Sequence, residues 1–164
     1  MDAYACIRSK RDTRDYAARA ISEESLQRIL QAGRMAGSSK NTQPWAFVVL
    51  RDPKRREELA ACGQFAKHVP AAPVAIAVVL TPPGGGDFDA GRAAQNMMLA
   101  AWAEGITSCP VSMHDRECAA RALGLPEGHR VAIVIAFGYP ASEASRHRGV
   151  ARTPLDELVH EEGW

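Results

Sequence analysis

A chain of 164 residues, with 46% apolar and 24% charged residues, has the size and composition of one globular domain that can bury a core. Its formal net charge of +1 gives no general attraction to nucleic acid or to an acidic membrane surface, so any charged patch must be local. No apolar run approaches the roughly 20 residues that span a bilayer.

The four cysteines, Cys6, Cys62, Cys109 and Cys118, are widely spaced and form no CxxC pair. The Met1 end lacks the apolar segment that secretory signals contain. Together these features predict reduced thiols in a cytoplasmic protein rather than a disulfide framework. The five histidines show no ligand spacing, so we expect no metal site.

Near the N-terminus, a short helix is predicted over residues 2–9, and the run Arg8–Arg14 holds four cations in seven positions. A cationic run is most often a solvated face. Arg and Lys on a loop can also bind a phosphate through charge-assisted hydrogen bonds. Asp12 would then orient a cation or accept from a ligand N–H. These residues alone leave both interpretations open.

The second predicted helix begins after Ser22, an N-cap that two acidic residues follow in the first turn. It leads into an unusually polar loop, Ser38-Ser39-Lys40-Asn41-Thr42-Gln43-Pro44-Trp45. Hydroxyls and carboxamides hydrogen-bond without carrying charge, which suits a polar, neutral ring edge better than a metal or a bare phosphate. A well-capped surface loop with a buried Trp explains the same residues equally well.

The rest of the chain alternates between apolar runs and helical patterns. We predict strands over 46–50, 74–80 and 131–137, a short extended segment within 106–113, and helices over 53–62, 87–104 and 115–123. The run 74–80 is apolar throughout, which predicts a strand buried on both faces. Helix 87–104 is apolar nearly all round and should be buried, with Gln95 and Asn96 bonded in the core or an interface. The pattern indicates an α+β fold in three layers, with a mixed sheet between helices.

Five stretches, in this order, resemble the nitroreductase family of flavin enzymes. They are Lys10-Arg11-Asp12-Thr13-Arg14, the polar loop 38–45, Gly105-Ile106-Thr107-Ser108-Cys109-Pro110, Leu123-Gly124-Leu125-Pro126 and Phe137-Gly138-Tyr139-Pro140. The resemblance covers roughly residues 5–160. It implies one FMN-binding domain over 1–164 with the nitroreductase-like three-layer α/β/α sandwich, and a homodimer that holds FMN at the subunit interface.

The resemblance also assigns residues to the flavin. The phosphate, ribityl chain and pyrimidine edge would meet the N-terminal basic stretch, at Lys10, Arg11, Asp12 and Arg14. The polar loop of the second subunit would contribute Ser38, Ser39 and Asn41. The segment along the isoalloxazine, with a backbone N–H near flavin N5, would be Pro110, Val111 and Ser112. A C-terminal basic pair would close on the phosphate at Arg146 and Arg148, with Arg152 as the alternative.

The activity that the resemblance implies is hydride transfer from NADH or NADPH, through flavin N5, to an electron-poor acceptor such as a nitroaromatic or a quinone. No protein nucleophile and no nucleic-acid or membrane partner is expected. Two alternatives stay open. Asp12, where the family often has Ser, suggests specialised FMN chemistry such as flavin fragmentation. The short connector 81–86, where relatives carry an insertion over the flavin, suggests an open pocket or a non-catalytic flavin-binding protein.

Overall fold

The computed structural model describes residues 2–83, 86–146 and 151–164, with only the backbone of residues 144 and 146. Its centre is a four-stranded sheet in the order β1-β2-β4-β3. The strands are β1 (Trp45–Leu50), β2 (Val74–Leu80), β3 (Thr107–Val111) and β4 (Arg130–Gly138). All three neighbouring pairs run antiparallel.

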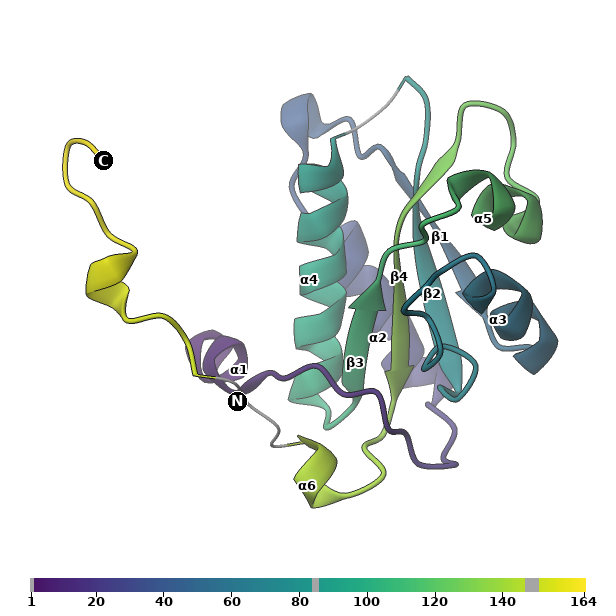
Figure 1. The fold of residues 1–164 in the computed structure, drawn as a ribbon, viewed down its shortest axis with the longest axis horizontal. Helices are drawn as coiled ribbons and strands as arrows, with labels where there is room; N and C mark the ends of the chain where they lie inside the picture. The colour runs from purple at the N-terminus through teal and green to yellow at the C-terminus, as the bar shows by residue number, and fades with distance from the viewer. Residues whose placement is uncertain (1, 84–85, 147–150) are drawn as a thin grey trace.

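Helices cover both faces of this sheet (Figure 1). One face packs against α2 (Glu23–Arg34) and the long α4 (Asp87–Ala103), and the other against α3 (Pro53–Ala60) and α5 (Arg116–Leu123). The short elements are α1 (Ala3–Ser9), α6 (Glu143–Arg146) and the 3₁₀ turns η1 (Ser39–Asn41) and η2 (Leu155–Glu157). The three-layer α/β/α sandwich is therefore confirmed. Within the described ranges, no helix is both long and apolar enough to cross a membrane.

The expected mixed sheet differs in one respect. Among the described residues, parallel pairing is confined to an isolated bridge between Asp12 and Ser108, where the segment after α1 runs beside β3. Strands that are apolar throughout, such as β2, are typical of parallel sheets, which are buried on both faces. Here the helical layers bury an antiparallel sheet in the same way.

The helices begin where the sequence places N-capping side chains. Asp2 Oδ1 accepts from the N–H of Ala5 at 2.8 Å, and Ser22 Oγ accepts from that of Ser25 at 3.1 Å. Asp52 and Asp115 cap α3 and α5 in the same manner. Each cap satisfies a backbone donor that the first helical turn leaves unpaired.

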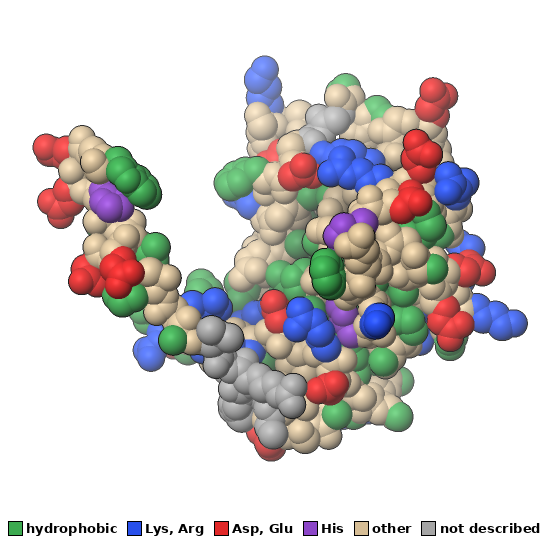
Figure 2. Space-filling model, in the orientation of Figure 1, with side chains coloured by type: hydrophobic (Ala, Val, Ile, Leu, Met, Phe, Trp, Pro, Cys, Tyr) green, Lys and Arg blue, Asp and Glu red, His purple; other side chains and the backbone are tan. Residues whose placement is uncertain are grey.

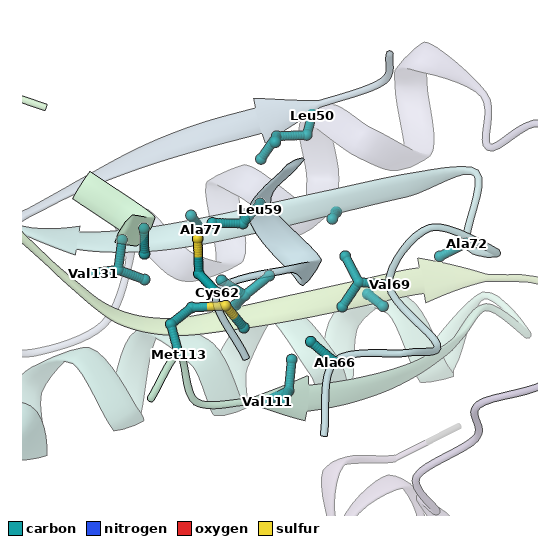
Figure 3. Close-up of a cluster of buried hydrophobic side chains, with 14 of the residues drawn as sticks. Leu50, Leu59, Cys62, Ala66, Val69, Ala72, Ala77, Val111, Met113 and Val131 are labelled. Carbon is teal, nitrogen blue, oxygen red and sulfur yellow. The ribbon is translucent and has the colours of Figure 1, made fainter. Parts of the chain in front are cut away.

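The core has two halves, divided by the sheet. Side chains alternate along β2, so that Val74, Ile76, Val78 and Leu80 face α2 and α4, while Ala75, Ala77 and Val79 face α3 and α5. Figure 3 shows the half of the core between the sheet and the helices α3 and α5, in which Leu59, Val69 and Met113 pack in one cluster with small alanine side chains. All seven residues of β2 are buried, as predicted for a strand covered on both faces.

A close contact between α2 and α4 depends on Gly33. A Cβ at this position would lie 2.2 Å from Met97 Cε and 3.2 Å from Phe47 Cζ. Met97 is fully buried and has little room to move. We therefore expect Gly33→Ala to lower the free energy of unfolding by roughly 1–3 kcal/mol through overpacking, measured by chemical denaturation.

Gly91→Ala in α4 is the matched control for Gly33→Ala. No atom lies within 4 Å of a Cβ built at Gly91, which is exposed. Alanine should stabilise this helical position by about 0.5–1 kcal/mol, because glycine loses more backbone freedom on folding. Equal effects of the two substitutions would contradict the packing argument.

The prediction of reduced thiols is wrong for one pair of cysteines. Cys62, just after α3, forms a disulfide with Cys118 of α5, with a Cα–Cα distance of 5.5 Å. The two residues are 56 positions apart in sequence, and only the packing of α3 beside α5 brings them together. Cys6 and Cys109 are free and buried. The cysteines therefore no longer support the expected cytoplasmic location.

The C-terminal segment 151–164 extends away from the sheet, and we call it the C-terminal arm (Figure 1). All of its residues are exposed, including four large apolar side chains, Leu155, Leu158, Val159 and Trp164. Within the described residues, the outer edge of β1 carries no paired strand.

Candidate functional site

A cavity of about 1060 Å³ lies where the segment after α1, the middle of α4 and the outer edge of β3 meet. The charged side chains that line it in the described part of the chain are Lys10, Arg11, Arg14 and Arg152, with Asp12 and Asp15. The remaining lining residues are Ile7, Thr13, Gln95, Met98, Pro110 and Ser145. Figure 2 shows basic side chains along the segment that passes in front of β3. Positive charge is thus in excess in this cavity.

Backbone pairing holds Asp12 and Thr13 against β3. The N–H of Thr13 donates to the carbonyl of Ser108 at 3.0 Å, beside the bridge between Asp12 and Ser108. The hydroxyl of Thr13 is buried and donates to the carbonyl of Ser145 at 3.1 Å, which ties the segment to α6. These contacts fix the backbone from which the neighbouring basic side chains extend.

Two of the cations have defined partners. Lys10 Nζ forms an ion pair with Asp12 and lies 3.5 Å from Met98 Sδ. Arg11 Nη1 donates to the carbonyls of Arg8 and Lys10, both at 2.8 Å. Asp12 therefore orients a cation in this structure. Toward the described residues, the other guanidinium nitrogens of Arg11 form no hydrogen bond.

The three residues assigned to the isoalloxazine point in different directions. Pro110 lines the cavity. Val111 is 7% exposed and its side chain packs in the core on the side of α3 and α5, while Ser112 lies beyond the strand and is exposed. The alternation of side chains along a strand explains the difference between Pro110 and Val111. Val111 can reach a ligand in this cavity only through its backbone groups.

The polar loop does not line the cavity of its own chain. Gly37, just before the loop, lies against Arg92 in the first half of α4, and Ser38, Ser39 and Asn41 follow it in and beside the turn η1. The loop is tightly wound: Lys40, Asn41 and Gln43 have φ values of 50°, 54° and 48°, and Ser38 Oγ accepts from the N–H of Gln43 at 2.8 Å. Left-handed conformations cost non-glycine residues of order 1–3 kcal/mol each and concentrate at functional sites.

The C-terminal basic residues are placed in part. Arg146 is the last residue of α6, but its side chain is outside the described atoms, and Arg148 lies outside the described residues. Arg152, the alternative, lines the cavity.

Sequence reasoning missed Thr13, Asp15, Met98 and Ser145 as lining residues. Gln95 is exposed in the cavity and therefore not bonded in the core, while a bond in a subunit interface stays a prediction. Asn96 does bond inside the chain, to the carbonyl of Ala32 at 3.2 Å. Gln95 and Met98 are three positions apart on α4 and so share a face. That spacing was visible in the sequence, but the side of α4 that borders a cavity was not.

Two titratable groups lie beneath the cavity on the opposite side of β3. Burial raises the pKa of the Cys109 thiol, and burial also holds the pKa of Tyr16 well above its usual range. The Tyr16 hydroxyl donates to the carbonyl of Ala136 at 3.4 Å. Both groups are therefore neutral at ordinary pH.

The fold and the cavity define an α+β protein with a basic, ligand-sized site at the edge of an antiparallel sheet. A model of the nitroreductase family matches residues 7–80 and 70–139. An Archaeoglobus fulgidus protein provisionally named NADH dehydrogenase/NAD(P)H nitroreductase is 33% identical, with 96% of each chain covered. The chain belongs to the nitroreductase family, and it is an oxidoreductase.

Solved structures agree with this assignment. A Desulfovibrio desulfuricans protein, provisionally named a nitroreductase and crystallised with FMN, is 32% identical, with a TM-score of 0.89 and coverage of 100% of this chain and 99% of its own. The NADPH:FMN oxidoreductase of Vibrio harveyi, complexed with NAD⁺, is 26% identical, with a TM-score of 0.89 and coverage of 98% and 77%. The match to the Desulfovibrio desulfuricans structure covers the whole of this chain.

Proposed function

We propose that residues 1–164 form one FMN-binding domain that moves a hydride from NADH or NADPH, by way of flavin N5, to an electron-poor small molecule such as a nitroaromatic or a quinone. The observation that carries the proposal is the basic cavity beside β3, in a chain whose similar Desulfovibrio desulfuricans structure contains FMN. When bound, FMN supplies the hydride chemistry; the protein binds it, orients it and tunes it.

The residues of the cavity fit the phosphate of FMN. Lys10, Arg11, Arg14 and Arg152 outnumber the carboxylates of Asp12 and Asp15 by two charges, which matches a phosphate dianion. A volume of about 1060 Å³ is at the upper end of the range for small-molecule sites, so a flavin mononucleotide has room. Arg11 and Arg152 would hold the phosphate, while Lys10 and Arg14 would lie near the ring and stabilise negative charge there.

The proposal includes a homodimer, supported by two features of the single chain. The C-terminal arm exposes Leu155, Leu158, Val159 and Trp164, of which Trp164 is 104% exposed. Apolar groups so exposed on an extended segment favour a partner surface. The polar loop, with Ser38, Ser39 and Asn41, lies away from its own cavity and would complete the cavity of the second subunit.

Removing residues 153–164 is expected to convert the dimer to a monomer and to weaken FMN binding at least 10-fold. The truncation keeps Arg152 but removes the apolar side chains of the arm. Light scattering after gel filtration gives the oligomeric state, and fluorescence titration gives the affinity. The charge-only variant Glu161→Gln with Glu162→Gln is the control and should stay dimeric. A truncated dimer that retains FMN would contradict the role of the arm.

The proposed function is tested with purified protein that has been saturated with FMN and desalted. Retained flavin, and oxidation of NADH or NADPH that depends on a nitroarene or a quinone, are expected. Flavin breakdown in air would favour fragmentation chemistry. Flavin retention without nicotinamide oxidation, across many acceptors, would favour a non-catalytic flavin-binding protein. The cytoplasmic location stays a prediction, which cell fractionation of the source organism checks.

A further inference from the structure

An exposed aromatic pair, Phe65 and His114, lies where the segment after α3 meets the segment after β3, and the proposed function does not use it. The two ring centroids are 5.5 Å apart at an interplanar angle of 63°, which is an edge-to-face contact. Phe65 is 71% exposed, and His114 is exposed as well. The pair therefore offers aromatic surface to a ligand.

Backbone contacts hold the two segments of this pair together. The N–H of Gln64 donates to Nδ1 of His114 at 3.3 Å, and the N–H of Asp115 donates to the carbonyl of Cys62 at 3.1 Å. The disulfide from Cys62 to Cys118 joins the same segments. Both rings are thus placed before a ligand binds, which reduces the entropy that binding costs.

The hydrogen bond from Gln64 also determines which nitrogen of His114 can donate. Because Nδ1 accepts, the neutral ring carries its proton on Nε2. No hydrogen bond joins this Nε2 atom to another residue that the structure describes. His114 therefore offers an N–H donor beside an aromatic ring. A planar ligand with an oxygen substituent on its ring can use both groups.

The exposed side of the segment that carries His114 begins at the cavity. Val111 and Met113 are buried in the core toward α3 and α5, whereas Ser112 and His114, which alternate with them, stay outside that core. Pro110, the next residue in the same alternation, lines the cavity. Four residues of extended chain span about 13 Å, so the aromatic pair lies within that distance along the segment from the cavity wall.

We propose that Phe65 and His114 form the subsite that holds the ring of the electron-poor acceptor. This inference rests on the proposed function, with FMN in the cavity that Pro110 lines. The acceptor ring would lie against Phe65, and Nε2–H of His114 would donate to its nitro or quinone oxygen. As the acceptor takes up the hydride, negative charge develops on this oxygen, which solvent then protonates. The hydrogen bond from His114 strengthens as that charge develops.

The test measures reoxidation of the flavin by stopped-flow absorbance. FMN-loaded protein, reduced anaerobically with dithionite, is mixed with para-benzoquinone or with nitrobenzene. His114→Ala and Phe65→Ala should each lower the second-order rate constant by about 3- to 10-fold, the value of one neutral hydrogen bond or one aromatic contact. Reoxidation by dioxygen, which has no ring to place, should keep the native rate in both variants.

Two further variants separate the subsite from a general effect of substitution. His114→Gln keeps a side-chain N–H donor and should retain more of the quinone rate than His114→Ala. His129→Ala is the matched control, because it removes an imidazole whose Nδ1 lies 3.2 Å from the carbonyl of Glu127 and which does not line the cavity. It should keep the native rates with every acceptor.

Native rates with both aromatic acceptors in His114→Ala and Phe65→Ala would overturn the inference while leaving FMN binding intact. The carboxamide of a nicotinamide offers a similar ring and oxygen, so reduction by NADH and NADPH is followed as well and should stay at the native rate. Slower reduction with unchanged reoxidation would also overturn the inference, because the pair would then serve the donor. Failure of the native protein to retain FMN would instead overturn the proposed function.

Discussion

Arg11→Ala is expected to weaken FMN binding by roughly 10- to 100-fold, because one charge-assisted hydrogen bond to the phosphate contributes about 1.5–3 kcal/mol. Arg11 lines the cavity, and its Nη1 atom is fixed by two backbone carbonyls, so the guanidinium is already oriented before a ligand binds. Arg152→Ala should have a similar effect. Titration of the protein with FMN, followed by flavin fluorescence, measures both affinities.

Riboflavin separates the phosphate contribution from that of the ring, because it lacks the phosphate. The affinity for riboflavin should be nearly the same in Arg11→Ala, Arg152→Ala and the native protein. Arg8→Ala is the matched control: Arg8 is an exposed cation on α1 that lies over the ring of Tyr4 and does not line the cavity. It removes the same charge and should leave FMN affinity unchanged. An equal loss of FMN affinity in Arg8→Ala would mean that the overall positive charge of the region, and not direct contact with Arg11 or Arg152, attracts FMN. The proposed position of the phosphate would then be wrong.

Replacing Cys62 and Cys118 together with Ala is expected to lower the free energy of unfolding by about 4 kcal/mol. The disulfide closes a loop of 56 residues that contains β2, α4 and β3, and cross-linking a loop of this length restricts the unfolded chain by about that amount. For a chain of this size, the loss corresponds to a fall in melting temperature of roughly 10 °C. Calorimetry with and without a reducing agent measures the effect.

The double alanine variant is also the control for reduction. A reducing agent should lower the melting temperature of the native protein and leave that of the variant unchanged. The FMN affinity of the variant should stay close to native, because the disulfide lies in the layer of α3 and α5 whereas the cavity is lined from α4 and the outer edge of β3. A native protein that melts at the same temperature in both conditions would show that the bond contributes no stability.

Most of the fold could be predicted from the sequence because its signals are local. The caps Ser22, Asp52 and Asp115 define where helices begin, and the apolar run of β2 defines a strand covered on both faces. Whether neighbouring strands pair parallel or antiparallel could not be predicted from the residues of the strands themselves. Burial on both faces is the same for a strand in a parallel sheet and for one between two helical layers.

The site was predictable to the extent that its residues cluster in the sequence. Lys10, Arg11, Asp12 and Arg14 come from one short stretch and line one cavity. Thr13 and Ser145 meet through a hydrogen bond across 132 positions, and Cys62 and Cys118 meet across 56. The spacing of these four residues in the sequence does not predict the hydrogen bond or the disulfide. Both contacts form only when β3, α5 and α6 pack in the folded protein.

Pro110 in β3 has a consequence for the solubility of the protein. Proline has no N–H to offer a neighbouring strand, and Asp12 and Thr13 already pair with Ser108 at the outer edge of β3. Edge strands are where folded proteins join one another into aggregates, and proline is one of the devices that prevent it. The six residues of β1, at the other end of the sheet, contain no proline. In the part of the chain that the structure describes, we therefore expect unwanted strand-to-strand association to occur at the outer edge of β1.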